Sequence, residues 1–258
     1  MEGSDARVID GSSGSSSSAA PGASGLMPIA LGALAVVTGV HLVARSAAPE
    51  GLVADITQVL LMLLLAAALL AGTSRPRGRL VGLVLFALFF SWLGDTVPRF
   101  VDGDGGFLSL VGCFLVAQVC YAVAFWPSRK HSLLVRPAAV AIYVAALVVL
   151  VVLCRDAGPL LVPVLIYGMA LVTMAVLATG LGPMAGVGGA IFLVSDSLIA
   201  VRAFAGVELP AHSFWVMLTY VIGQVLLVLA VRSRSVESVA PRGDESGATA
   251  ASPPDAGR

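Results

Sequence analysis

Apolar residues run through the middle of the chain in eight long segments, which are separated by short stretches containing Gly, Pro or Arg. Each segment has about 20 residues, the length that an α-helix needs to cross the hydrocarbon core of a bilayer. The pattern therefore predicts an all-α membrane protein built as an eight-helix transmembrane bundle. The predicted spans lie near residues 26–44, 51–71, 79–99, 106–126, 133–153, 159–179, 184–203 and 213–231.

The two ends of the chain lack this pattern. Residues 1–25 and 232–258 are rich in Ser, Gly, Ala and Pro and contain few large apolar side chains, a composition typical of disordered segments. The N-terminal stretch has no apolar core of the kind that a signal peptide contains. We therefore expect a disordered N-terminal tail (1–25), an eight-span transmembrane domain (26–231) and a disordered C-terminal tail (232–258).

An even number of spans places both termini on one side of the membrane, and the charges indicate which side. Eleven Lys and Arg residues fall on the side of the termini and four on the other. Cytoplasmic loops carry the excess of Lys and Arg, so we expect both termini in the cytoplasm. A seven-span arrangement would remove this asymmetry. The four basic residues on the outer side are Arg45, Arg99, Arg155 and Arg202.

Composition excludes several classes of protein. The chain is 58% hydrophobic and 12% charged, whereas a soluble domain has roughly a quarter of its residues charged. The formal net charge is zero, so the chain has no electrostatic footprint for nucleic acid. The three cysteines and three histidines form no cluster with metal-ligand spacing, and we expect no metal and no cofactor. High Ala and Arg usage with little Lys favours a bacterial inner membrane as the location.

Two acidic residues stand inside predicted spans. Asp95 lies near the outer end of the span at 79–99, and Asp196 lies within the span at 184–203. An aspartate at the centre of a membrane helix costs about 3 kcal/mol on insertion scales, and such residues usually face a cavity or a partner. The alternative for each is a structural aspartate that bonds to the backbone or reaches the outer interface.

Other polar side chains fall at a similar depth. With a rise of about 1.5 Å per residue, they gather with the two aspartates in one layer in the outer half of the membrane. We therefore expect a polar cavity that opens outward. The tyrosines could instead belong to an interfacial belt, and the glutamines could be interhelical hydrogen-bond partners. These residues are Gln58, Gln118, Tyr167, Tyr220 and Gln224.

Arg99 and Arg202 follow the two aspartates at the outer ends of their spans. Each could pair with its aspartate or bind a lipid phosphate, although long basic side chains near a helix end commonly snorkel to the interface. His41 is expected to be interfacial, and we assign no role to the other two histidines. The sequence contains no phosphate-binding loop and no nucleophile elbow, so any chemistry here would be aspartate chemistry.

The chain contains a series of short segments that runs from Phe90-Ser91-Trp92-Leu93-Gly94-Asp95 through Ser195-Asp196 to Thr219-Tyr220. In this order the segments resemble the YhhN family of eight-span membrane proteins, the lysoplasmalogenases. The resemblance covers roughly residues 50–231, and its most specific parts are Gly94-Asp95 and Ser195-Asp196. The remaining segments are Phe90-Ser91-Trp92-Leu93, Phe114 to Phe125 with Gln118 and Tyr121, Pro163-Val164 with Tyr167-Gly168, Gly189 to Phe192, and Thr219-Tyr220 with Gln224-Val225-Leu226.

The resemblance implies hydrolysis of the vinyl ether bond of a lysoplasmalogen, giving a fatty aldehyde and a glycerophospho-base. Asp95 and Asp196 then become the catalytic pair, and the lysophospholipid substrate and membrane lipid become the partners. The family usually has a Lys where this chain has Gln58 and a His where it has Gln118, so both departures remove an ionisable group. The implied substrate-binding residues are Gln58, Gln118, Tyr121, Tyr167, Tyr220, Gln224, Arg99 and Arg202.

Vinyl ether hydrolysis needs a carboxylic acid that protonates carbon and a carboxylate that steadies the resulting cation and activates water. As a working assignment we take Asp95 as the acid and Asp196 as the base. The alternative function is a non-enzymatic lipid-binding or transport protein with a degenerate site, since the spans near 79–126 and 184–231 look alike in plan. No sequence feature bears on the oligomeric state.

Overall fold

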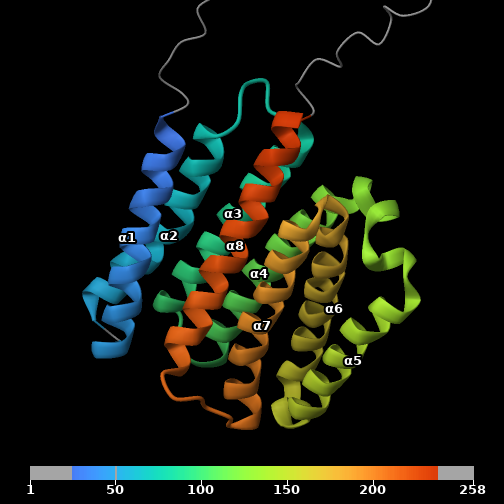
Figure 1. Ribbon diagram of the computed structural model, residues 1–258. Coiled ribbons are helices and arrows are strands. Elements are labelled where there is room, and N and C mark those ends of the chain that lie inside the picture. Colours follow the sequence, from blue (N-terminus) through green and yellow to red (C-terminus); the bar gives the residue numbers. More distant parts are fainter. Residues whose placement is uncertain (1–24, 50, 238–258) are drawn as a thin grey trace, which may run out of the picture.

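The computed structural model describes residues 25–49 and 51–237, and every regular element within them is a helix (Figure 1). The eight α-helices correspond one to one with the eight predicted spans. They are α1 (Leu26–Ala47), α2 (Leu52–Ala71), α3 (Arg79–Thr96), α4 (Gly103–Phe125), α5 (Pro137–Leu153), α6 (Leu161–Ala178), α7 (Pro183–Ala205) and α8 (His212–Glu237).

Seven of these helices, taken with the short 3-10 turns that continue some of them, have the length and hydropathy to cross a membrane. The eighth, α5, has 17 residues and is shorter than its predicted span. Pro137 occupies the first turn of α5, where its fixed φ and missing N–H suit the start of a helix. Residues 133–135 form a separate 3-10 turn in front of it.

The C-terminus of α8 differs from the sequence prediction in one respect. Helix α8 continues to Glu237, so residues 232–237 are helical, whereas the sequence pattern predicts that they belong to the C-terminal tail. Arg234 accounts for part of this extension, because its Nε donates to the carbonyl oxygen of Leu181 at 3.0 Å. The rest of both predicted tails lies outside the described residues.

Helix α8 occupies the centre of the bundle, where it contacts α1, α2, α3 and α7 (Figure 1). Helix α4 lies between α3 and α6, and α5 packs on the outside of α6 and α7 with no buried residue of its own. The start of α1 and the end of α8 lie at the same end of the bundle (Figure 1). This end is called the terminal end below, and the other is called the site end.

Glycines allow α7 and α8 to approach closely. A Cβ atom on Gly188 of α7 would lie 3.0 Å from the Gly223 oxygen of α8, and one on Gly223 would lie 3.0 Å from the Gly188 oxygen. Small residues at a crossing are a common means of helix association in membranes. This crossing fixes α8 against the helix that carries Asp196.

Candidate functional site

The two aspartates line one cavity at the site end of the bundle, with a volume of about 430 Å³. Asp95 lies one residue before the end of α3 and is 9% exposed, and Asp196 lies within α7. Much of the remaining wall is apolar and includes Phe107, Phe114 and Ile199. The structure thus brings the predicted pair together from two helices that are far apart in sequence.

Both carboxylate oxygens of Asp95 accept hydrogen bonds. The Tyr220 hydroxyl on α8 donates to Oδ2 at 2.9 Å, and the Gln58 amide on α2 donates to Oδ1 at 3.3 Å. The oxygen of Gln58 in turn accepts from Arg99 Nη2 at 2.5 Å. Arg99 also forms an ion pair with Asp55, so the hydrogen-bonded group around Asp95 ends in a charge pair.

Asp196 has a different environment. The Tyr167 hydroxyl of α6 hydrogen-bonds to its Oδ2, and its Oδ1 makes no hydrogen bond within the described part of the chain. A side cavity of about 40 Å³ lies beside both residues. Asp196 therefore keeps one carboxyl oxygen available to a molecule in the cavity.

Small residues next to each aspartate hold its helix in place. Ser195 is fully buried, and its hydroxyl donates to the Val216 carbonyl oxygen of α8 at 3.0 Å. On α3, Ser91 accepts from the Gln224 amide at 3.2 Å. Gly94 leaves room for the Phe114 ring, which lies 2.6 Å from where a Cβ would stand. In both the Gly94-Asp95 and the Ser195-Asp196 pair, a carboxyl group that lines the cavity therefore follows a residue that packs against a neighbouring helix.

Three of the predicted site residues, Gln118, Tyr121 and Gln224, are fully buried and do not line the cavity. The Tyr121 hydroxyl donates to the Gln224 oxygen at 2.6 Å. This bond, with the one to Ser91, joins α4, α8 and α3, the role of an interhelical hydrogen-bond partner. Gln118 lies close to the Tyr167 hydroxyl but makes no hydrogen bond within the described residues.

The arginines gather at the mouth of the cavity. Arg202 lines it and forms an ion pair with Glu208 at 3.1 Å. Arg99 contacts Gln58 from outside, and its Nε donates to the backbone oxygen of Asp95 at 3.1 Å. Among the described residues, neither arginine pairs with the carboxylate of a predicted catalytic aspartate.

Two residues that line the cavity are not among the site residues predicted from sequence. Arg45 reaches the cavity from α1, and His212 lines it from the first position of α8. His212 is 4% exposed, and its ring bonds to the Leu198 oxygen at 3.1 Å and the Leu209 amide at 3.2 Å. An arginine at a helix end and a histidine beside a loop are ordinary features of membrane sequences, so neither gave a signal.

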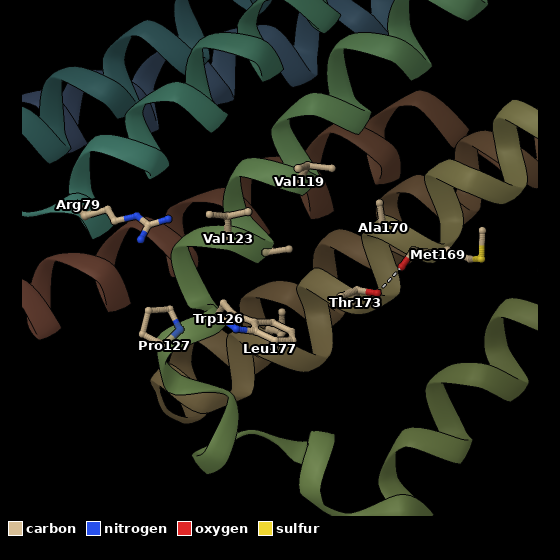
Figure 2. Close-up of a pocket in the computed structure, with 10 residues that line it drawn as sticks. Arg79, Val119, Val123, Trp126, Pro127, Met169, Ala170, Thr173 and Leu177 are labelled. Atoms are coloured by element: carbon tan, nitrogen blue, oxygen red, sulfur yellow. Dashed lines mark hydrogen bonds between the residues drawn. The ribbon is translucent and has the colours of Figure 1, made fainter.

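A larger hollow of about 540 Å³ lies between α4 and α6, toward the terminal end, and its surroundings are shown in Figure 2. Its lining is mostly apolar and includes Val119, Trp126 and Met169, with Arg79 at one edge. The Thr173 hydroxyl beside it is bonded to the Met169 oxygen at 2.7 Å. None of its lining residues is acidic, so it lacks the groups that acid–base chemistry at this site would need.

Comparison with known proteins bears on this arrangement. No curated protein and no solved structure matches the chain. A sequence profile of the YhhN family matches residues 53–231, a region that includes both aspartates and the residues that bond to them. Because this match covers most of the chain and all of α3, α4, α6 and α7, the chain belongs to the YhhN family.

Proposed function

We propose that this chain is a lysoplasmalogenase-like hydrolase of the membrane, which cleaves the vinyl ether bond of a lysoplasmalogen to a fatty aldehyde and a glycerophospho-base. One observation carries the proposal: Asp95 and Asp196, from separate helices, line the same cavity of about 430 Å³. Membership of the YhhN family supports a lysoplasmalogenase-like membrane protein at the level of the family.

The cavity suits a lipid with one hydrocarbon chain. Phe107, Leu110 and Ile199 offer apolar contact, while Arg202 and Ser213 supply polar contact at the mouth. Ligand sites typically combine a mostly apolar lining with a few placed polar groups. A lysophospholipid has this division, because its chain is apolar and its headgroup is charged.

The proposed reaction has three steps. First, a carboxylic acid transfers its proton to the carbon of the double bond that is not attached to oxygen. The carbon attached to oxygen then becomes part of an oxocarbenium ion. Water then adds to that carbon, and the second carboxylate accepts a proton from the water. In the third step the carbon–oxygen bond to glycerol breaks, and the second carboxyl returns its proton to the departing oxygen. The hemiacetal hydroxyl gives its proton to the first carboxylate, which restores the acid and yields the aldehyde and the free hydroxyl of the glycerophospho-base.

Hydrogen bonding favours roles opposite to those of our working assignment from sequence. Both oxygens of Asp95 accept hydrogen bonds, from Tyr220 and Gln58, which suits a carboxylate that steadies the cation and accepts a proton from water. Asp196 has one oxygen bonded to Tyr167 and the other without a partner among described residues. We therefore place the proton that is transferred to carbon on Asp196.

The test is aldehyde release from a lysoplasmalogen by the purified full chain in detergent. Asp196→Asn and Asp95→Asn should each lower kcat by a factor of about 10² to 10⁴, the usual contribution of a general acid or base. Asp102→Asn is the matched control, because Asp102 is exposed before α4 and makes no capping bond, and it should retain full activity.

Either aspartate variant with wild-type turnover would remove that residue from the mechanism. A folded wild type that binds the lipid and releases no aldehyde would refute the hydrolase and favour a lipid-binding protein. Thermal unfolding monitored in the same detergent shows whether each variant is folded.

A further inference from the structure

We propose that Arg45 is the centre of a phosphate-binding site at the mouth of the cavity, formed with Arg99 and Arg202. The ligand is a phosphate anion, and the phosphodiester of a lysophospholipid headgroup is the form that fits best. The choice of lipid rests on the proposed function, whereas the anion site rests on the arginines alone.

Arg45 lines the cavity and has a buried hydrogen-bond donor with no partner among the described residues. It lines the cavity near the end of α1, and its Nη1 donates to the Pro49 oxygen at 2.7 Å. Its Nε is buried and has no hydrogen-bond partner among the described residues. A buried donor without a partner carries a desolvation cost of about 1–3 kcal/mol, which a ligand oxygen would remove.

The charges around Arg45 do not balance. Arg99 pairs with Asp55, and Arg202 pairs with Glu208. Arg45 pairs with no carboxylate in the parts of the chain that the structure describes, and it lies within electrostatic range of both other arginines. Of the three guanidinium groups, Arg45 alone therefore has no acidic partner among the described residues. In a low-dielectric cavity an anion would be attracted strongly to such a group.

Phosphate matches these donors in charge and shape. Guanidinium groups bind phosphate oxygens through paired, charge-assisted hydrogen bonds. A phosphodiester carries one negative charge, which would give Arg45 the anionic partner that it lacks among the described residues. Arg45, Asp95 and Asp196 line the same cavity, so a headgroup held at its mouth would leave the vinyl ether, on the same glycerol, near the carboxylates.

The distribution of arginine along the chain agrees with this site. Sequence places four arginines on the outer side of the membrane. Two of them, Arg45 and Arg202, line the cavity, and a third, Arg99, bonds to Gln58, which also lines it. They come from α1, from the 3-10 turn Val97–Phe100 and from α7. Interfacial snorkelling alone would not require arginines from three separate elements to converge.

The experiment measures binding to the full chain in detergent, with ligands that contain no vinyl ether. A 1-O-alkyl lysophospholipid carries the phosphate, and the matching 1-O-alkylglycerol does not. Arg45→Gln should weaken binding of the first by about tenfold or more and leave affinity for the second unchanged. Arg136→Gln is the control, because Arg136 is exposed before α5 and its side chain makes no capping bond.

An equal effect on both ligands, or no effect on either, would overturn the proposal. Arg45→Lys should recover part of the affinity, because it keeps the charge but loses the paired geometry. Inorganic phosphate is the competitor that separates the two sources of the anion. Competition at micromolar concentrations would assign the site to free phosphate, whereas failure to compete at millimolar concentrations supports the lipid headgroup.

These results are independent of turnover. Binding that depends on Arg45 in a chain that releases no aldehyde would keep the anion site and reject the proposed hydrolase. Aldehyde release with binding indifferent to Arg45→Gln would do the reverse.

Discussion

Gln118 on α4 is fully buried, and neither its amide nitrogen nor its oxygen makes a hydrogen bond among the described residues. Gln224 on α8 is equally buried, yet its oxygen accepts from Tyr121 and its nitrogen donates to Ser91. The two side chains have the same chemistry and differ only in whether their polar atoms are paired. They therefore allow a direct comparison of what an unpaired buried amide costs.

Replacing Gln118 by Met, which is similar in size and cannot leave an amide unpaired, should raise the free energy of unfolding by about 1–3 kcal/mol. The same change at Gln224 should lower it by a comparable amount, because the Tyr121 hydroxyl and Ser91 would lose their partner. Thermal unfolding in detergent, followed by fluorescence, measures both. A loss of stability in the Gln118 variant would mean that this amide has a partner in the folded chain.

Single residues were predictable from sequence where membrane burial makes them costly. Asp95 and Asp196 were found in this way, because an acidic group inside a span needs a reason to be there. Arg45 and His212 were not, since both stand at helix ends where polar groups are common. Depth along a helix also gives no direction around it, and this is why Gln118 and Gln224 were expected in the cavity but do not line it. Tyr121, which the family resemblance implied, does not line it either.

At the scale of the helices, hydropathy gave the eight elements but not all of their ends. Hydropathy reports where a helix leaves the hydrocarbon, and α8 continues beyond that point to Glu237. Its last turns are held by the bond from Arg234 to Leu181 and by the Ser235 hydroxyl on Val231. Pro137 shortened α5 for a local steric reason that hydropathy does not contain.

The close crossing of α7 and α8 gives a prediction at this scale. Gly188→Ala should lower the free energy of unfolding by about 1–3 kcal/mol, because the new Cβ would lie 2.9 Å from the Leu226 Cβ and 3.0 Å from the Gly223 oxygen. Gly82→Ala on α3 is the control, because no atom lies within 4 Å of its Cβ position. It should be neutral or stabilising by up to about 1 kcal/mol, from helix propensity.

Denaturation of the two variants side by side in one detergent provides the measurement. Equal stability of the Gly188 and Gly82 variants would show that the crossing can widen without cost.

For the whole molecule, the sequence predicts an orientation as well as a fold. The Lys and Arg residues on alternate loops place the termini in the cytoplasm, and the structure puts the start of α1 and the end of α8 at one end of the bundle (Figure 1). The cavity with the aspartates lies at the other end. The substrate would then enter from the outer leaflet.

Cysteine labelling in intact cells tests this orientation, in a chain whose three cysteines are replaced by Ala. Val207→Cys lies between α7 and α8 at the site end, and Ser74→Cys lies between α2 and α3 at the terminal end, both at exposed positions. A membrane-impermeant maleimide should label residue 207 in intact cells and residue 74 only after permeabilisation. The reverse pattern would place the site in the cytoplasm.

Helix α1 packs on α2 and α8 and brings Arg45 to the cavity, yet it precedes the segment that carries the family resemblance. In the proposed site the carboxylates that break the bond stand on α3 and α7, and the central phosphate contact stands on α1. Selection can therefore alter the outer end of α1, and with it the lipid that is accepted, without disturbing the acid–base pair. Substrate preference and chemistry would then be inherited on different helices and diverge at different rates.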